Sequence, residues 1–264
     1  MCEADGFSLA DTLECGQCFR FVKNPDKSYS GVALGRGVTL WQDSGRLFAA
    51  GFDERLFTCE YRSYFALDVD YAAIHALFEE DAVLMKAVEF APGIRVLRQP
   101  LFETLISFIL SQNNNIKRIG GIIERLCEKF GERLEGGVFD FPTPEALAGK
   151  ACSDLAELRC GYRDAYVLDA AERWAKGVID RDVVMHAPLA DARRELARIK
   201  GVGPKVADCV LLFGAARYDA FPEDVWIKRA MGELFPGGLP EPIKPYAGIA
   251  QQYIYHFARA HFAP

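Results

Sequence analysis

The sequence predicts an α+β fold that is mainly α, with a twisted antiparallel sheet at the N-terminus and a larger helical body after it. Three observations lead to this prediction. Short apolar runs separated by turn residues fill residues 6–65, apolar residues recur at helical spacing from about residue 70 onward, and a glycine turn at 201–203 joins two helical segments. We place an N-terminal antiparallel β domain at residues 1–90 and a helical body at residues 91–264, with a helical hairpin at about 191–213.

The predicted strands occupy residues 18–22, 31–34, 37–41 and 46–50. They are separated by Asn-Pro-Asp at 24–26, by Gly35 and by Asp-Ser-Gly at 43–45, all of which are common turn sequences. Because the runs are short and the turns are tight, successive strands are expected to pair as an antiparallel meander.

Helical spacing is clearest after Asn115, where the apolar residues form one stripe: Ile119, Ile122, Ile123, Leu126 and Phe130. Residues 102–112 carry a shorter apolar stripe. The hairpin combines a predicted helix at 191–199 with another at 204–213. Pro204 takes the first helical position, where its missing N–H costs nothing.

The formal net charge of −6 is concentrated in the first third of the chain. Residues 1–90 hold 8 Lys and Arg against 15 Asp and Glu, whereas residues 91–235 hold 21 of each kind. A neutral helical region can still present a basic face, and backbone N–H groups bind phosphate without formal charge. The composition therefore allows nucleic acid binding with few phosphate contacts.

The ends and the apolar runs of the sequence predict neither a secretion signal nor a membrane span. The N-terminus is acidic and lacks the apolar core of a signal peptide. No apolar run reaches the roughly 18 residues that a transmembrane helix needs.

The eight cysteines do not predict a disulfide framework or a metal site. Without a secretion signal, reduced thiols are the default. Cys15 and Cys18 have the spacing of half a zinc or redox site, but a second pair at suitable spacing is missing, and the four histidines form no metal-binding pattern. No cysteine follows Cys209, which excludes a C-terminal iron–sulfur loop. We predict no metal site.

The segment around Gly201 and Gly203 has the pattern of a helix-hairpin-helix. Glycine lets the backbone turn sharply and approach a phosphate closely. The N-terminus of the following helix directs free N–H groups and a positive dipole end toward that phosphate. The two glycines are therefore candidate phosphate-binding residues, although a Gly-x-Gly turn before a helix is a weak signal by itself.

Lys205 and Asp224 are the candidate catalytic residues. Lys205 lies in the first turn of the second hairpin helix, and a lysine amine must be neutral to attack carbon, which desolvation or nearby positive potential favours. A solvated or phosphate-binding lysine is the alternative reading. Asp224 precedes a predicted helix, so it can cap that helix, stabilise positive charge on a reacting sugar, or do both. Glu223 is the adjacent competitor for the catalytic role.

Several segments together resemble the 8-oxoguanine DNA glycosylase/AP lyases of the helix-hairpin-helix superfamily. They are DTLECGQCFR at 11–20, LRQP at 97–100, SQNNNIKR at 111–118, CGYR at 160–163, KVADC at 205–209, Asp224, and YAGIAQQY at 246–253. The matches follow the order of the family and span nearly the whole chain. One departure is Trp226, which stands where relatives have a histidine, so no phosphate contact is assigned there.

The resemblance implies a base pocket. Lys205 is similar to the nucleophile that attacks C1′ of the damaged nucleotide, and Asp224 to the carboxylate that assists glycosidic cleavage. Gly16 is similar to the glycine whose carbonyl accepts a hydrogen bond from N7–H, a donor that guanine lacks. Cys209 and Tyr255 are similar to the two walls of the pocket, with tyrosine where many relatives have phenylalanine. Gln251 is similar to the reader of the Watson–Crick edge. For Gln251 and Tyr255, ordinary helix packing is the alternative.

The resemblance also implies a site for the DNA left behind when a base is flipped out. Asn113 is similar to a residue that fills the vacated space, and Tyr162 to a wedge that holds the duplex kinked. Arg118 and Arg163 are similar to arginines that donate hydrogen bonds to the unpaired cytosine. A solvated surface position is the alternative for Arg118.

The function implied is removal of 8-oxoguanine, preferentially opposite cytosine, by a bifunctional DNA glycosylase and AP lyase that forms a lysine Schiff base in base excision repair. The alternatives are a glycosylase for another lesion, such as an alkylated base, and a non-catalytic helix-hairpin-helix protein that binds DNA. No cofactor is required, although carbonyls of the hairpin turn could hold a structural cation. The expected partner is double-stranded DNA containing 8-oxoguanine, the expected state is a monomer, and the expected location is inside the cell with the DNA (cytoplasm or nucleoid in a bacterium).

Overall fold

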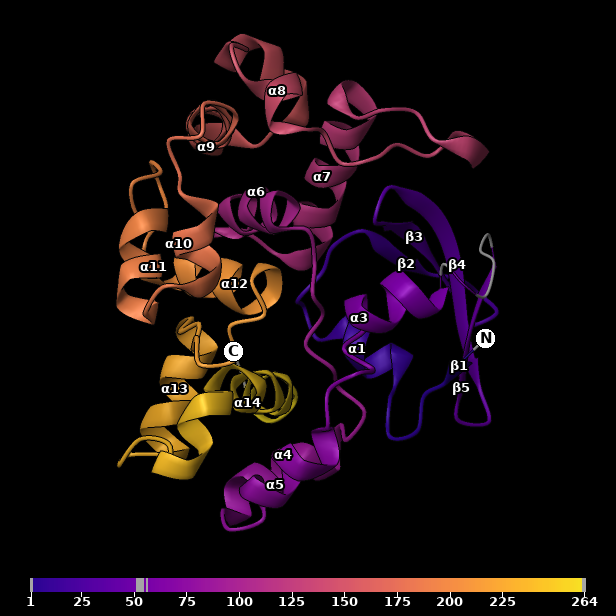
Figure 1. Cartoon of the computed structure of the whole chain (residues 1–264), viewed down its shortest axis with the longest axis vertical. Helices are drawn as coiled ribbons and strands as arrows, with labels where there is room; N and C mark the ends of the chain where they lie inside the picture. The colour runs from indigo at the N-terminus through magenta and orange to yellow at the C-terminus, as the bar shows by residue number, and fades with distance from the viewer. Residues whose placement is uncertain (1, 51–54, 56, 263–264) are drawn as a thin grey trace.

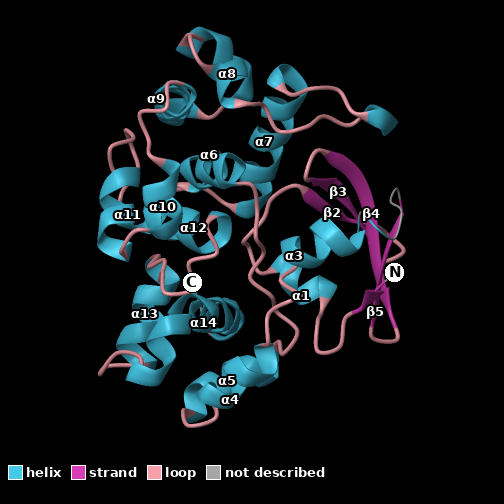
Figure 2. Cartoon of the chain, viewed as in Figure 1, coloured by secondary structure: helices cyan, strands magenta, loops and turns pink. Residues whose placement is uncertain are grey.

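The computed structural model describes residues 2–50, 55 and 57–262. A five-stranded antiparallel sheet lies at one side of the molecule and helices form the rest (Figures 1 and 2). The strands are β1 (Cys2–Glu3), β2 (Phe21–Lys23), β3 (Tyr29–Ala33), β4 (Arg36–Asp43) and β5 (Arg46–Ala50). Their order across the sheet is β1-β5-β4-β3-β2, so β2 to β5 form the predicted meander. The mainly helical α+β prediction is confirmed.

The helices have the following bounds: α1 (Leu9–Glu14), α3 (Arg62–Tyr64), α4 (Tyr71–Phe78), α5 (Ala82–Phe90), α6 (Leu101–Ser111), α7 (Ile116–Phe130), α8 (Pro144–Leu147), α9 (Asp164–Ala175), α10 (Arg181–His186), α11 (Leu189–Leu196), α12 (Pro204–Gly214), α13 (Val225–Leu234) and α14 (Ala247–His261). The predicted helices after Asn115 and from Pro204 begin as expected. Among the described residues, no helix is both long and apolar enough to span a bilayer.

The expectation that residues 6–65 form only strands is wrong at both ends of that segment. Helix α1 precedes the first meander strand, because Ser8 caps it by accepting a hydrogen bond from the Asp11 N–H at 3.2 Å. Residues 18–20 belong to an irregular loop, so the first meander strand starts only at Phe21. A π-helical turn (Phe57–Tyr61) and α3 follow the sheet instead of further strands.

The buried apolar residues form two clusters whose division lies near residue 65. The smaller cluster joins α1, the sheet, residues 57–65 and Leu97, while the larger one contains Cys15 and then runs from Ala66 to Ala258. Helices α4 and α5 contribute to the larger cluster, and α5 packs against α14, as Figure 1 shows at the bottom of the molecule. A domain boundary at residue 90 stays a prediction.

Glu103 on α6 lies where the helical body meets the loop before β2. Its Oε2 lies 3.7 Å from Nη1 of Arg20, and Oδ1 of Asp140 lies 3.8 Å from the same nitrogen. Burial raises the pKa of Glu103 to about 7, although the nearby Arg20 guanidinium opposes this shift. The protonated carboxyl is therefore favoured by folding.

The protein should lose stability as the pH rises from about 4.5 to about 7. Across this window the folded state keeps a proton on Glu103 that the unfolded chain has released. The free energy of unfolding should then fall by up to about 1.4 kcal/mol per pH unit. Glu103→Gln should flatten this part of the curve, and urea unfolding at several pH values measures it. An identical slope in the variant would show that Glu103 is not the titrating group.

Candidate active site

The predicted hairpin consists of α11, the turn at residues 200–203 and α12. Gly201 has a φ of +82°, and a Cβ there would come within 2.3 Å of the Tyr166 ring. Only glycine therefore fits this position. Asp169 fixes the turn, because its Oδ2 accepts a hydrogen bond from the Lys200 N–H at 2.8 Å. Gly203 then precedes α12, leaving the helix N-terminus after it as a place for a phosphate.

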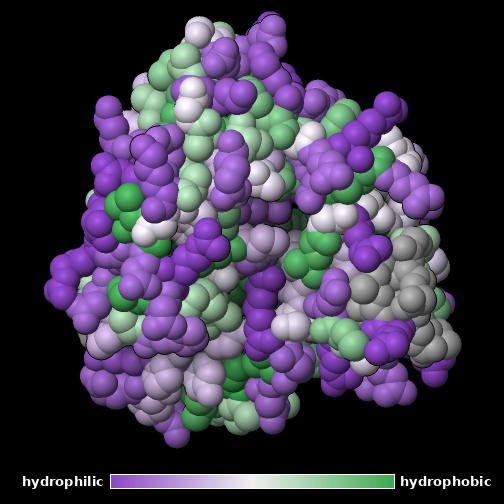
Figure 3. Space-filling model, turned by 45° about the horizontal axis from the view of Figure 1, so that its top comes forward, coloured by the Kyte–Doolittle hydropathy of each residue, from purple (hydrophilic) through white to green (hydrophobic). Residues whose placement is uncertain are grey.

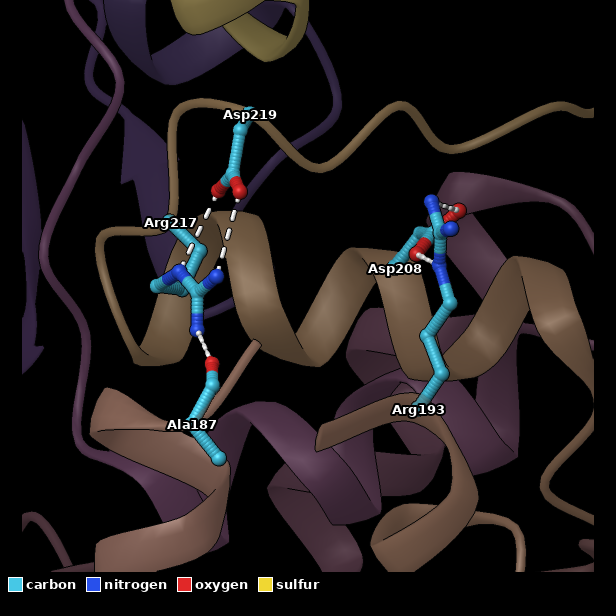
Figure 4. Close-up of polar contacts among 5 residues, drawn as sticks. All are labelled: Ala187, Arg193, Asp208, Arg217 and Asp219. Atoms are coloured by element: carbon cyan, nitrogen blue, oxygen red, sulfur yellow. Dashed lines mark hydrogen bonds and ion pairs between the residues drawn. The ribbon is translucent and has the colours of Figure 1, made fainter. Parts of the chain in front are cut away.

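A bidentate ion pair joins the two hairpin helices. Arg193 on α11 donates from Nε to Oδ1 of Asp208 on α12 at 2.6 Å and from Nη2 to Oδ2 at 3.1 Å (Figure 4). Burial raises the pKa of Asp208, and the Arg193 guanidinium opposes this rise. In the same view, Arg217 bonds to Asp219 and to the Ala187 carbonyl, which ties the segment after α12 to the end of α10.

One pocket gathers the residues predicted to catalyse base removal and to bind the base. It has about 320 Å³ of empty volume, open to solvent, and lies between α6, α12, α14 and the loop that carries Gly16. Its lining residues are Gly16, Phe108, Lys205, Cys209, Phe213, Pro222, Asp224, Gln251, Gln252 and Tyr255. These come from residues 16 to 255, so only the tertiary fold brings them together.

Lys205 reaches into this pocket from the first turn of α12. Its Nζ lies 5.0 Å from the centroid of the Phe108 ring and 3.5 Å from Oγ of Ser111. No carboxylate in the described part of the chain forms an ion pair with it. The amine is thus held against an aromatic ring at the base of the pocket, without a salt-bridge partner that would have to be displaced before it reacts.

The position of Asp224 allows it both to cap a helix and to face the pocket. It is the N-cap of α13, and its Oδ1 accepts a hydrogen bond from the Ile227 N–H at 2.8 Å. Its side chain also lines the pocket with Lys205, whereas the competing Glu223 is exposed and does not. One carboxylate oxygen capping the helix leaves the other free to face a developing positive charge.

Gly16 and Cys209 form neighbouring parts of the pocket wall. Gly16 has a φ of +86°, and a Cβ there would lie 3.3 Å from Cδ1 of Ile116 and 3.5 Å from Cε1 of Tyr255. A side chain at this position would narrow the pocket. Burial raises the pKa of the Cys209 thiol to about 11, so this group is a neutral wall rather than a nucleophile.

Gln251 and Tyr255 face the pocket from α14. Gln251 Nε2 donates to the Pro222 carbonyl at 3.1 Å, and Gln251 Oε1 accepts from Gln252 Nε2 at 2.8 Å. These two bonds fix the orientation of the Gln251 amide. The guanidinium of Arg259 lies 5.4 Å from the centroid of the Tyr255 ring. This arrangement holds an aromatic face ready for stacking against a base.

Sequence analysis missed Phe108, Phe213, Pro222 and Gln252 as pocket residues. The rings of Phe108 and Phe213 stack with centroids 5.2 Å apart and form the apolar floor. Both belong to helical stripes that read as ordinary core, so no local signal distinguishes them. Gln252 directly follows Gln251, and this doubled glutamine was the only available clue.

Three of the four residues predicted to contact the vacated DNA position, Asn113, Tyr162 and Arg163, contact one another. Asn113, with a φ of +47°, donates from Nδ2 to the Tyr162 hydroxyl at 3.3 Å. Tyr162 is 52% exposed, and its ring lies 4.5 Å from the Arg163 guanidinium. Arg118 is exposed and its Nη2 lies 3.4 Å from the Arg159 carbonyl. The Tyr162 ring and the Asn113 amide are thus displayed together, and Arg118 is exposed and bonds to the chain three residues before Tyr162.

Arg163 differs from the other three residues because it is 4% exposed and four of its five N–H groups are in use. It bonds to the carbonyls of Gln112, Asn113 and Cys160. In this structure Arg163 holds the loop of Asn113 in place. Bonding to an unpaired base through more than the one remaining Nη1–H would require Arg163 to exchange at least one of these backbone bonds.

Hydrophilic residues cover much of the face drawn in Figure 3, with hydrophobic residues scattered among them. Within residues 2–50, 55 and 57–262, no group of three or more His, Cys, Asp or Glu side chains is arranged to hold a metal ion.

Family models match both parts of the chain. Residues 1–105 match the N-terminal domain of 8-oxoguanine DNA glycosylase, and residues 106–242 match the HhH-GPD superfamily of base excision DNA repair proteins. A yeast N-glycosylase/DNA lyase (Saccharomyces cerevisiae) is 33% identical over an alignment 253 residues long, and the match covers 84% of this chain and 66% of the yeast protein.

Solved structures give the same result. The 8-oxoguanine glycosylase/lyase of Clostridium acetobutylicum, solved with double-stranded DNA containing cytosine opposite 8-oxoguanine, has a TM-score of 0.91 and 34% identity. The match covers 98% of this chain and 94% of that one. A 3-methyladenine DNA glycosylase from Archaeoglobus fulgidus shares the fold, with a TM-score of 0.72, at 19% identity over 92% of this chain and 91% of its own.

The hairpin and the lysine-containing pocket therefore define a protein of the helix-hairpin-helix base excision repair class. Within that class, the chain belongs to the 8-oxoguanine DNA glycosylase/AP lyase family.

Proposed function

We propose that this protein is a bifunctional DNA glycosylase and AP lyase that removes 8-oxoguanine, preferentially opposite cytosine, in base excision repair. The observation that carries the proposal is the pocket itself, in which Gly16, Lys205, Asp224 and Gln251 line one space. The Gly16 carbonyl can accept a hydrogen bond from the damaged base, and the Lys205 amine can attack its sugar. This combination suits removal of a neutral base that is recognised by hydrogen bonding. The partner is double-stranded DNA, and the enzyme acts inside the cell where that DNA lies.

The first chemical step is displacement of the base by Lys205. The neutral amine attacks C1′ of the flipped nucleotide while the N-glycosidic bond breaks, and the base leaves with its bonding electrons. Positive charge develops on the sugar in this transition state, and the Asp224 carboxylate stabilises it. Phe108 and Phe213 exclude water from the floor of the pocket, which strengthens this electrostatic interaction.

The second step uses the same lysine. Loss of a proton from nitrogen and opening of the sugar ring convert the adduct into a Schiff base between Lys205 and C1′. The Schiff base acidifies the adjacent C2′ hydrogen, so a general base can remove this proton. The 3′ phosphate then leaves by β-elimination. Strand cleavage therefore follows from covalent catalysis by an amine.

Lesion recognition depends on Gly16. The absence of a side chain lets the backbone carbonyl approach the base edge, where 8-oxoguanine offers an N7–H donor and guanine offers an acceptor. An unpaired or repulsive contact of this kind costs about 1–3 kcal/mol when buried. Gln251 is the proposed reader of the Watson–Crick edge, and the hydrogen bonds of its amide to Pro222 and Gln252 support this proposal by restricting its orientation.

Opposite-base preference is assigned to Arg118, which is exposed and bonds to the carbonyl of Arg159, three residues before Tyr162. Arg118→Ala should lower excision opposite cytosine by about 5- to 100-fold and leave excision opposite the other three bases nearly unchanged. Single-turnover excision of 8-oxoguanine opposite each of the four bases measures this. Lys117→Ala, at the neighbouring position, is the matched control. Equal losses opposite all four bases would remove the cytosine-reading role.

Two finer expectations belong to this proposal. A structural cation on the carbonyls of the hairpin turn is one, and a location in the cytoplasm or nucleoid of a bacterium is the other. An alkylated base is the competing substrate, and parallel excision assays with 3-methyladenine and 8-oxoguanine duplexes separate the two. Preferential release of 3-methyladenine would overturn the proposal.

A further inference from the structure

Gly16 lies in a loop that has no regular secondary structure to hold it. Helix α1 ends at Glu14 and β2 begins at Phe21, so the backbone between them lacks the hydrogen bonds of a helix or a sheet. If the Gly16 carbonyl is to recognise the base, its position must nevertheless be fixed to within a fraction of an ångström, because hydrogen-bond strength falls steeply with poor geometry. Something outside the loop must position it.

Gln17, the next residue, is completely buried and supplies the missing bonds. Its Nε2 donates to the Arg95 carbonyl at 2.7 Å, and its Oε1 accepts from the Leu97 N–H at 2.8 Å. Residues 94–99 belong to no helix or strand, and these two groups have the spacing, C=O of one residue and N–H of the next but one, that a neighbouring strand would bond in a sheet. The Gln17 side-chain amide thus makes the two hydrogen bonds that the backbone of a neighbouring strand would otherwise make. A second bond from Nε2, to the Thr12 carbonyl at 2.8 Å, ties the same amide to α1.

A second glutamine continues the connection toward Lys205. Gln99 Nε2 donates to the Gln17 backbone carbonyl at 2.8 Å, and the Gln99 N–H donates to the Phe213 carbonyl at 2.8 Å. Phe213 lies in the last turn of α12, the helix that begins with Pro204 and Lys205. Its ring stacks on Phe108, which in turn faces the lysine amine. Hydrogen bonds therefore run from the peptide beside Gly16 to the nucleophile's helix.

We infer that Gln17 and Gln99 are positioning residues that set the place of the Gly16 carbonyl relative to Lys205, and thereby the selection of the oxidised base. Neither side chain lines the pocket, so neither touches the base. The inference rests on the proposed function and extends it to residues remote from the substrate. Glutamine is required because a carboxylate at position 17 accepts hydrogen bonds but cannot donate to the carbonyls of Thr12 and Arg95.

Base release and cleavage at an abasic site separate this role from a general structural one. An abasic site has no base for Gly16 to read, yet its cleavage still needs Lys205. Gln99→Met removes only the side-chain bond to Gln17 and keeps the backbone bond to Phe213. It should slow single-turnover release of 8-oxoguanine by on the order of 10- to 100-fold, with abasic-site cleavage changed by no more than about threefold.

Two further variants complete the test. Gln17→Glu should slow base release even more than Gln99→Met does, again with little change in abasic-site cleavage. If the Gln17→Glu variant does not fold, Gln99→Met still tests the inference. Gln42→Met is the matched control, because Gln42 also clamps the backbone, at Phe7 and Leu9, but does not reach the Gly16 loop. It should leave both rates unchanged.

The outcomes are distinct. Equal losses of both activities in Gln99→Met, or no loss of base release, would overturn the positioning role. Failure of the parent protein to release 8-oxoguanine while it cleaves abasic sites would instead overturn the proposed function.

Discussion

Replacement of Lys205 by glutamine should abolish the covalent adduct that borohydride traps between the protein and an 8-oxoguanine duplex. The reduced adduct requires an amine at this position, and no other lysine lines the pocket. Base release in single turnovers should fall by on the order of 10³-fold or more, because loss of a nucleophile removes the covalent route entirely. Denaturing gel electrophoresis of the trapped complex measures the adduct directly.

Lys200→Gln is the control for this experiment. Lys200 lies in the same hairpin, is exposed and does not line the pocket, so its loss removes one positive charge without removing the nucleophile. The adduct should persist in this variant. Persistence of the adduct in Lys205→Gln would mean that a different amine attacks C1′ and that Lys205 has only a structural or phosphate-binding role.

Replacement of Asp224 by asparagine should lower base release by about 10²- to 10³-fold while the protein stays folded. Asparagine can still accept the hydrogen bond from the Ile227 N–H, so the helix cap survives. The free energy of unfolding should change by less than about 1 kcal/mol, most of it from the lost charge at the N-terminus of α13. Rapid-quench excision assays measure the rate of base release, and urea unfolding measures the free energy of unfolding.

The alanine and neighbouring variants separate the two roles of Asp224. Asp224→Ala loses the cap as well and should destabilise the protein by roughly 1 kcal/mol more than the asparagine variant. Glu223→Gln removes the adjacent exposed carboxylate and should leave base release nearly unchanged. A large loss in Glu223→Gln with little in Asp224→Asn would reverse the assignment.

Local sequence signals predicted the elements whose formation depends on neighbours along the chain. The stripe from Ile119 to Phe130 became α7, and Pro204 starts α12, because helical spacing and a first-turn proline are both read within a few residues. The short helix α1 was missed. It has only six residues, and besides its Ser8 cap it is held by a bond from the Leu9 N–H to Gln42, 33 residues away.

The site shows the same division. Lys205, Asp224 and Gly16 were identified through motifs, and the pocket contains all three. The motifs did not show which hydrogen-bond partners each polar side chain has in the folded protein. Arg163 is buried and bonds to three backbone carbonyls, and its contact with an unpaired base stays a prediction. Burial of an arginine depends on which carbonyls surround it, and those come from a different loop.

By itself, the sequence determined the class of fold, the hairpin, the candidate nucleophile and the family, because turn chemistry, helical spacing and ordered motifs are written in consecutive residues. The tertiary structure decided which residues share the pocket, how Phe108 and Phe213 form its floor, and how Gln17 and Gln99 connect Gly16 to the helix of Lys205. These contacts join residues up to about 240 positions apart. Their hydrogen bonds and packing exist only once the chain has brought those positions together.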